Sequence, residues 1–555
     1  MKLRQASWMA AMAVLGLGVV ARAQAPQAVK AAEASIDPEK IRAHVRFLSD
    51  DLLEGRGPGL RGSELAAKYI ATQFALDGLQ PGGDHGSYFQ QVRFVGMKVK
   101  AAETSFAFLP LQGDAQRLTY GDDYTVTNQQ GTAAVDVDAP IVFVGYGATA
   151  PEFGWDDYAG VDVKGKVILC IVGDPPSDDP KFFGGAALTY YGRWTYKFEQ
   201  AARMGAVGAL IIHRTDLASY GWEVVRNSNT SEKTYLADDK NQKLKAASWI
   251  QLEVARKLFA ASGLDLETEM TAAGKRGFKA VELPVRLTAH VESVVRPYEN
   301  PNVVGILPGS SAAKDQAVLY TAHFDHLGFV PGMAGDNIYN GAADNATGCG
   351  MILELARAWS QMAQAGTKLP HSVIFSAVTA EEQGLLGSEY LGQHPPIPAG
   401  QIALDINYDM ILPIGIPEQV NVNGAQRTSF FPTVQATAKR FDLGIVPDPR
   451  PAAGSYYRSD HFSLSRVGIP AFSVETGTKY EGHDEAWGKA KFQDFEDHDY
   501  HNFSDNYHAD WDFRGNAKLD RFGMELGWEA LTAPGGIHWN AGDEFEAARK
   551  ASLGN

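Results

Sequence analysis

The stretch VLYTAHFDHLGF (Val318–Phe329) carries an apolar run into two histidines and an aspartate. The run that ends at Ala322 does not alternate between polar and apolar residues, which is typical of a strand buried on both faces of a parallel sheet. His323, Asp325 and His326 come where that strand should end. A polar turn explains such a group as well as a metal site does, so the decision depends on the residues at the ends of the other strands.

Three further apolar runs are similar to the first. Between the first two runs, the segment ATGCGMILELARAWSQM places apolar residues three and four positions apart, which is typical of an amphipathic helix. Alternation of buried strands and helices predicts an α/β fold, with a mixed, mostly parallel sheet flanked by helices. The predicted strands span residues 317–322, 373–378, 402–408 and 469–474.

Residues with ligand side chains follow the ends of these strands. Ligands of open α/β sheets bind at the carboxyl ends of the strands, so these residues should meet at one edge. Each has an ordinary explanation by itself, as a turn residue or as an acidic residue at the start of a helix. Together, five such residues would have to reach one edge by chance. The set comprises His323, Asp344 in NGAADNATG, Glu381 and Glu382 in TAEEQGLLGS, Asp409 in NYDM, and Tyr500 and His501 in EDHDYHNFSDNYHADWDF.

The donor types in this set indicate a pair of metal ions. Two histidines and three carboxylates, counting one of the adjacent Glu381 and Glu382 and no thiolate, suit two borderline-hard divalent cations that share one carboxylate. Ions about 3.5–4 Å apart are a known arrangement in aminopeptidases. The adjacent Glu381 and Glu382 point in different directions, so one is expected to bind metal while the other faces a water. A general base must lie near the metal without being committed to it.

The N-terminus has the charged, apolar and small-residue regions of a secretory signal peptide, MKLRQASWMAAMAVLGLGVVARAQAPQ. Residues 1–23 are predicted to be removed by cleavage after Ala23, which places the protein in a secreted or periplasmic location. No later segment has eighteen uncharged apolar residues, so no membrane span is expected after cleavage.

The formal charge of −16 argues against nucleic acid as a partner, because such binding requires basic patches.

Changes in composition and in the pattern of apolar residues divide the rest of the chain into three segments. Residues 36–101 have the pattern of a helix, a loop and a helix, and residues 281–555 carry the alternating strands and helices. Between them, residues 102–280 contain short strand-like runs among Gly, Asp and Pro, which predicts an inserted β-rich domain. Cys170 and Cys349 are far apart in the sequence and are predicted to be free, buried thiols.

These motifs resemble, in order, those of a known family. HFDHLG, NGAADNATG, TAEEQGLLGS, NYDM and DYHNFSDNY resemble the motifs of di-zinc aminopeptidases of metallopeptidase clan MH, which also holds relatives of leucyl aminopeptidase, glutamate carboxypeptidase and the transferrin receptor. Residues 102–280 resemble a protease-associated (PA) domain, notably in DDYAGVDVKGKVILCIVGDPP and QAARMGAVGALIIHR. The resemblance implies a zinc exopeptidase fold of the phosphorylase/hydrolase-like kind. Residues 36–101 and 281–555 would form its peptidase domain, and the PA domain would be inserted between them.

The resemblance also implies a role for each site residue. His323 and Asp409 would bind one zinc ion. Glu382 and His501 would bind the other, with Asp344 as the bridge between the two ions. Asp325 would orient His323 from behind. Glu381 would be the general base, and Tyr500 would donate its hydroxyl to the oxyanion. His326 matches no ligand position and is expected to be a hydrogen-bonded neighbour of the site or a residue on its rim.

The activity implied by the resemblance is that of an exported aminopeptidase, which hydrolyses the N-terminal bond of peptides with a free N-terminus through a metal-bridging water. A carboxypeptidase for acidic C-termini or a glutaminyl cyclase remains an alternative. The carboxypeptidase would need a cluster of arginines, and the segment DPRPAAGSYYRSD supplies only Arg450 and Arg458. A non-catalytic binding protein of the transferrin-receptor kind should have lost ligands or the Glu381–Glu382 pair, and this chain retains them.

Overall fold

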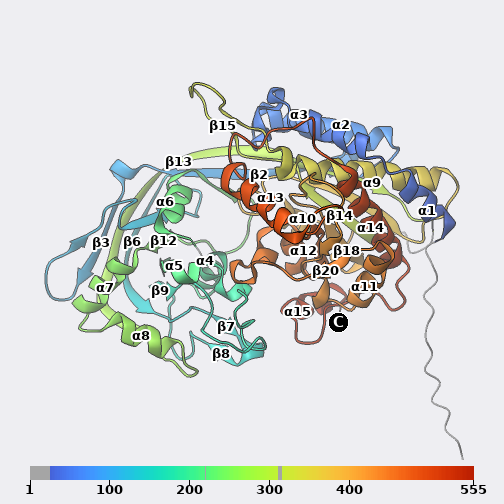
Figure 1. Cartoon of the computed structure of the whole chain (residues 1–555). Coiled ribbons are helices and arrows are strands. Elements are labelled where there is room, and N and C mark those ends of the chain that lie inside the picture. The colour runs from blue at the N-terminus through green and yellow to red at the C-terminus, as the bar shows by residue number, and fades with distance from the viewer. Residues whose placement is uncertain (1–25, 219, 311–315, 555) are drawn as a thin grey trace, which may run out of the picture.

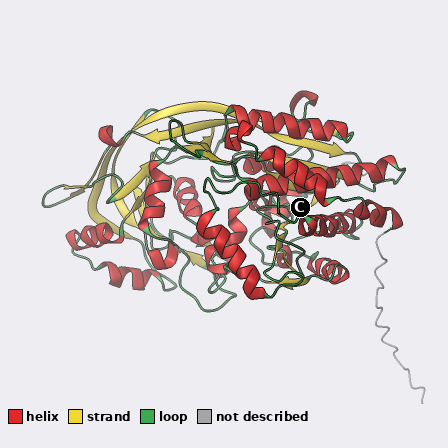
Figure 2. Ribbon diagram, turned by 45° about the horizontal axis from the view of Figure 1, so that its top comes forward, coloured by secondary structure: helices red, strands yellow, loops and turns green. Residues whose placement is uncertain are grey.

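The computed structural model describes residues 26–218, 220–310 and 316–554. The predicted signal peptide, residues 1–23, lies outside these residues. Within the described ranges, no helix is long and apolar enough to cross a membrane. The chain forms two halves that share one large sheet, and the half with most of the helices carries the predicted site (Figures 1 and 2).

Four parallel strands form the centre of the site half. β14 (Ala317–His323) lies between β17 (Ser372–Val378) and β18 (Ile402–Asn407), and β21 (Ala471–Ser473) pairs with β18. β14 and β17 are buried along their whole length, as expected of strands that are covered on both faces. Each of the four predicted apolar runs forms a strand, so the predicted α/β fold with a mostly parallel sheet is confirmed.

Helices cover both faces of these strands. In the described residues the α-helices are α1 (Gln27–Ala34), α2 (Pro38–Leu48), α3 (Arg61–Leu76), α4 (Trp194–Arg203), α5 (Thr215–Ala218), α6 (Trp222–Thr230), α7 (Leu252–Ala261), α8 (Leu266–Ala273), α9 (Thr347–Gln364), α10 (Leu386–Gln393), α11 (Phe431–Arg440), α12 (His461–Arg466), α13 (Glu485–His498), α14 (Arg514–Leu531) and α15 (Glu546–Ser552).

Successive side chains of β14 enter two different hydrophobic cores. Tyr320 packs in the core that includes α9 and α14, and its hydroxyl donates a hydrogen bond to the carbonyl of Gly523 (3.0 Å). Leu319 points to the other face, into the core that includes Leu391 of α10 and Leu464 of α12. Both faces of the strand are therefore held, which fixes the position of its last residue, His323.

One long strand, β13 (Val281–Leu307), joins the two halves of a 15-stranded sheet (Figure 1). Its last residues pair with β17 in the site half, and its first residues pair with β6 (Ala134–Phe143) in the other half. Beyond β6, three strands continue in parallel: β9 (Val167–Ile171), β10 (Gly208–Ile212) and β12 (Ala246–Ile250). β2 (Phe89–Val99) runs antiparallel along the middle of β13.

Cys170 of β9 and Cys349 of α9 are buried and free, which confirms the prediction that both are free, buried thiols.

The remaining strands are short or lie at edges. The further strands are β1 (Gln80–Pro81), β3 (Ser105–Pro110), β4 (Gln116–Arg117), β5 (Tyr124–Thr127), β7 (Thr149–Ala150), β8 (Trp155–Asp156), β11 (Lys233–Leu236), β15 (Gly328–Phe329), β16 (Ile338–Tyr339), β19 (Gln419–Asn421), β20 (Gly444–Val446) and β22 (Glu475–Thr476).

Candidate metal centre

The carboxyl ends of three parallel strands bring predicted site residues to one edge of the sheet. β14 ends at His323, and the paired strands β17 and β18 end at nearly the same level. Glu381 and Glu382 follow β17, and Asp409 follows β18. The loop before α9 and the loop after α13 add the other two predicted ligands, Asp344 and His501.

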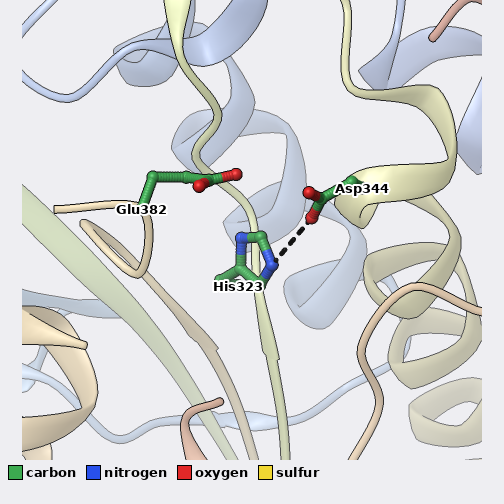
Figure 3. Close-up of side chains that lie close together, drawn as sticks. All are labelled: His323, Asp344 and Glu382. Atoms are coloured by element: carbon green, nitrogen blue, oxygen red, sulfur yellow. Dashed lines mark ion pairs between the residues drawn. The ribbon is translucent and has the colours of Figure 1, made fainter. Parts of the chain in front are cut away.

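The five predicted ligands form two sets of three that share Asp344. In the first set, His323 Nε2 lies 3.3 Å from Asp344 Oδ1 and 3.2 Å from Asp409 Oδ1. In the second set, His501 Nε2 lies 3.2 Å from Asp344 Oδ2 and 3.0 Å from Glu382 Oε2. Figure 3 shows His323, Asp344 and Glu382, whose ligand atoms lie within 4.8 Å of one another. The two oxygens of Asp344 thus face different histidines.

The distances between donor atoms fit tetrahedral metal ions. Zinc bonds of about 2.0–2.1 Å place two ligand atoms about 3.3 Å apart at the tetrahedral angle. The four distances within the two sets are 3.3, 3.2, 3.2 and 3.0 Å. Imidazole nitrogens and carboxylate oxygens are donors that zinc accepts. The residues present therefore fit a pair of zinc ions, one for each set, with Asp344 common to both.

The charge around the site favours cations. Burial lowers the pKa of His501, but Glu382 and Asp344 outweigh burial and raise it to about 10. Burial also lowers the pKa of His323, and Asp409 and Glu381 outweigh it, so that this pKa lies well above its ordinary value. Carboxylates that hold protons on the buried imidazole of His323 and on the partly exposed imidazole of His501 create a negative potential, and a divalent cation is stabilised by the same potential.

Glu381 and Asp325 are neighbours of the predicted ligands and contact each other. The Glu381 backbone N–H donates to Asp325 Oδ1 (3.1 Å), and the Glu381 side chain lines a cavity. Burial raises the pKa of Glu381, His323 lowers it, and Glu382 raises it further, so that it lies well above its ordinary range. His323 Nδ1 lies 3.2 Å from the backbone carbonyl of Asp325 and 3.9 Å from its Oδ1. The backbone of Asp325, rather than its carboxylate, is therefore the nearer partner of His323.

A cavity of about 690 Å³ opens beside the ligands. Glu381, Glu382 and Tyr500 lie in its wall, and the Tyr500 ring stacks on His501 with centroids 3.9 Å apart. Residues of α4 and β11, from the segment 102–280, form the opposite wall. The volume of the cavity is within the range of pockets that bind small ligands, about 300–1,000 Å³, and residues of both halves line it.

Comparison with known proteins identifies the part of the chain that contains this site. Residues 302–519 match the model of peptidase family M28. This region of the chain belongs to peptidase family M28. The predicted relationship to metallopeptidases of clan MH is thereby confirmed. All five predicted ligands, together with Glu381 and Tyr500, lie within the matched residues.

Relatives of the M28 region include two curated proteins. Leupeptin-inactivating enzyme 1 of Streptomyces exfoliatus is 29% identical over 223 residues, which cover 38% of this chain and 46% of that protein. Leucine aminopeptidase 1 of Fusarium vanettenii is 29% identical over 206 residues, which cover 35% of this chain and 50% of that protein. The matches therefore span about half the length of these relatives.

Solved structures of aminopeptidases also align with the chain. An aminopeptidase from Aneurinibacillus sp. strain AM-1 has a TM-score of 0.48 at 19% identity, covering 90% of this chain and 96% of its own. The zinc aminopeptidase BSAP from Bacillus subtilis has a TM-score of 0.42 at 17% identity, with coverage of 89% and 95%.

Two further side chains contact oxygens of predicted ligands: Ser459, which was given no role from the sequence, and His326, which was given one. Ser459 Oγ donates to Asp409 Oδ2 (2.6 Å), and its signal in the sequence was its place in the segment YYRSDHF. His326 is fully buried, and its Nδ1 lies 2.8 Å from Glu382 Oε1. The expectation of a hydrogen-bonded neighbour therefore describes His326, and a position on the rim does not. Each contact is made to the carboxylate oxygen that does not face the predicted ligand histidine, because His323 lies near Asp409 Oδ1 and His501 near Glu382 Oε2.

Asp505 holds the loop that carries Asp344 in the M28 region. Its two oxygens accept hydrogen bonds from the backbone N–H groups of Ala343 (2.8 Å) and Asp344 (3.1 Å), and its side chain is buried. Asp505 lies in the motif DYHNFSDNY, only a few residues after His501. One short segment therefore supplies a ligand and also fixes the backbone of another ligand.

Arg56, which precedes the M28 region, links the loop that follows His323 with the loop that precedes Asp344. The side chain is fully buried, and it donates to the carbonyls of Phe324 (2.7 Å), Asn340 (2.6 Å) and Gly341 (2.8 Å) and to that of Leu48. Burial lowers the pKa of Arg56. The guanidinium supplies the donors that these carbonyls need in a space closed to water.

Replacement of Arg56 by leucine is expected to lower the free energy of unfolding by about 3 kcal/mol or more, because buried carbonyls left without donors each cost about 1–3 kcal/mol. Urea denaturation followed by tryptophan fluorescence measures this change. Arg46→Leu, on an exposed face of α2, is the matched control and should change stability by less than about 0.5 kcal/mol. Equal stabilities for the two variants would contradict the role of Arg56.

Proposed function

We propose that this protein is an exported zinc-dependent aminopeptidase that removes the N-terminal residue of peptides. The observation that carries the proposal is the pair of donor sets that share Asp344, with the Glu381 side chain lining the cavity next to them. A site with two cation positions, a free carboxylate and an adjoining cavity has the parts that hydrolysis of a peptide bond requires.

The residues of the site have separate roles in binding metal and in transferring protons. His323 and Asp409 would hold one zinc ion, His501 and Glu382 the other, and Asp344 would be common to both. Zinc bound there would polarise the scissile carbonyl and lower the pKa of a water. Glu381 accepts the proton of the attacking water at its carboxylate and delivers it to the nitrogen of the leaving amine.

The surroundings support the roles of the remaining residues. Tyr500, stacked on His501, donates its hydroxyl to the oxyanion of the tetrahedral intermediate, where a donor is commonly worth about 3–4 kcal/mol. Asp325 positions both His323 and Glu381 through its backbone carbonyl and its carboxylate. The substrate's α-amine would bind at the carboxylate-rich end of the cavity, which limits cleavage to the first residue.

The location and domain organisation are part of the same proposal. A cleaved signal peptide over residues 1–23 would direct the protein to the periplasm or the medium. Residues 36–101 and 281–555 would form the peptidase domain, and residues 102–280 would be an inserted PA domain. The wall that α4 and β11 contribute to the cavity gives this inserted segment a part in substrate binding.

An assay on matched substrates tests the proposed function. We expect hydrolysis of aminoacyl-nitroanilides and of free peptides, little hydrolysis of their N-acetyl forms, and loss of more than about 99% of the activity after chelation, because the metal supplies the attacking group. Zinc added back should restore activity. Activity that survives exhaustive chelation would refute the metal site. Equal cleavage of free and N-acetylated peptides would refute the aminopeptidase, and release of C-terminal glutamate alone would indicate a carboxypeptidase.

A further inference from the structure

Two arginines from different halves of the molecule meet in the wall of the cavity. Arg193 directly precedes α4 in the segment 102–280, and Arg458 lies in the loop before α12. Both line the same cavity as Glu381 and Tyr500. The Arg193 Nε–H is buried and has no hydrogen-bond acceptor within the described residues. A buried donor of a charged group without an acceptor is costly in a folded protein, so it points to a ligand.

Other arginines of the cavity wall differ from this pair because they have carboxylate partners. Arg466 and Arg203 both bind Glu199, at 3.0 and 3.5 Å. Arg450, which is close to Arg458 in the sequence but does not line the cavity, pairs with Glu496. Neither Arg193 nor Arg458 has a carboxylate oxygen within 4.0 Å among the residues described. Arg458 is exposed to solvent in the cavity, whereas the Nε–H of Arg193 is buried, so the lack of an acceptor is unusual at Arg193.

The two guanidinium groups lie near each other and near the proposed catalytic residues. Burial, and after it the positive charge of Arg458, lowers the pKa of Arg193 to about 10. Arg458 and Tyr500 line the same cavity, and the next residue after Arg458 in the chain, Ser459, donates to Asp409. The neighbours of Arg193 that act on it besides Arg458 are tyrosines: Tyr190, Tyr220 and Tyr457. The pair is therefore within the reach of one short peptide.

We infer that Arg193 and Arg458 form a subsite that binds a carboxylate of the substrate. That the bound molecule is a substrate rests on the proposed function, whereas the binding of a carboxylate does not. The planar guanidinium donates two parallel hydrogen bonds to a carboxylate, which satisfies Arg193 Nε–H and neutralises the pair. Because one arginine comes from each half, the inserted segment takes part in choosing the substrate.

A carboxylate reaches this subsite from one of two sources. It is the C-terminal carboxylate of a di- or tripeptide, or an acidic side chain next to the cleaved bond. Two pairs of substrates distinguish these sources. The first pair is a peptide with a free C-terminus and the same peptide with a C-terminal amide. The second pair consists of two peptides with amidated C-termini, one with aspartate and one with asparagine next to the cleaved bond. The remaining parts of each pair are identical, so the difference reports the carboxylate alone.

The test measures kcat/KM for both substrate pairs with the wild type and with Arg193→Gln, Arg458→Gln and Arg203→Gln. In the wild type the carboxylate form of at least one pair should be preferred by about tenfold or more, as charge-assisted bidentate hydrogen bonds are strong. Each of Arg193→Gln and Arg458→Gln should reduce that preference to about twofold or less. Arg203→Gln, whose arginine lines the same cavity but is paired with Glu199, should retain the full preference.

Calorimetry separates this inference from the proposed function. The same peptide pairs are titrated into the zinc-loaded Glu381→Gln variant, with and without Arg193→Gln, so that binding is measured even where no peptide is hydrolysed. Tighter binding of a carboxylate form that depends on Arg193 supports the subsite. Equal binding of both members of both pairs, or a preference that survives Arg193→Gln and Arg458→Gln, overturns it.

Discussion

Replacement of Glu381 by glutamine is expected to lower kcat by about 1,000-fold while the protein keeps its metal, since a positioned general base commonly contributes about 10²–10⁴-fold. Glutamine has nearly the same shape, and the Glu381 backbone N–H would still bind Asp325. What it lacks is a basic oxygen that takes a proton from water. The predicted loss is therefore in turnover, and KM should change little.

The measurement combines steady-state kinetics with metal analysis of the same preparation. Glu389→Gln is the matched control, because Glu389 also lines the cavity but lies on α10, where its carboxylate accepts from Gln393 (3.1 Å). This control should retain at least about half of the wild-type kcat, as expected of a substitution outside the reacting groups. A Glu381→Gln variant within tenfold of the wild type, or one that has lost its metal, would contradict the assignment of Glu381 as general base.

The part of the site that depends on local pattern was predictable from the sequence. His323, Glu382 and Asp409 were found because each lies at or just after the end of an apolar run, and parallel strands have their carboxyl ends at one edge. The strand assignment alone placed them together. Asp344 and His501 lie outside these strand ends, and their placement relied on sequence motifs. The structure brings their side-chain atoms to within 3.0–3.3 Å of the histidine and carboxylate partners.

The part that depends on tertiary contacts could not be predicted. Arg56 stands in a glycine-rich turn that suggests only a break between helices, yet its side chain binds carbonyls of loops 268 and 285 residues later in the chain. Arg193 has no local feature that relates it to Arg458, because the two meet only when the halves form one cavity. No periodicity or spacing encodes such contacts, as they are set by the packing of elements far apart in the chain.

Asp344 is the one ligand on which both donor sets depend. Its Oδ1 lies near His323 and its Oδ2 near His501, and Asp505 holds its backbone N–H so that the loop cannot turn away without breaking that bond. Asparagine at this position keeps one oxygen but replaces the other by an NH₂ group, which donates hydrogen bonds and repels a cation. One of the two sets must then lose its shared ligand.

The Asp344→Asn variant is therefore expected to bind one zinc ion or fewer per chain and to lose activity by more than about 1,000-fold, because a two-metal site requires a ligand that both ions share. Metal analysis after gel filtration in zinc-free buffer gives the stoichiometry, and the aminoacyl-nitroanilide assay gives the rate. Asp336→Asn replaces an exposed aspartate in the segment between His323 and Asp344, and this control should keep both metal and activity. Retention of two ions by Asp344→Asn would show that the sets are filled independently, and the bridging role would then be wrong.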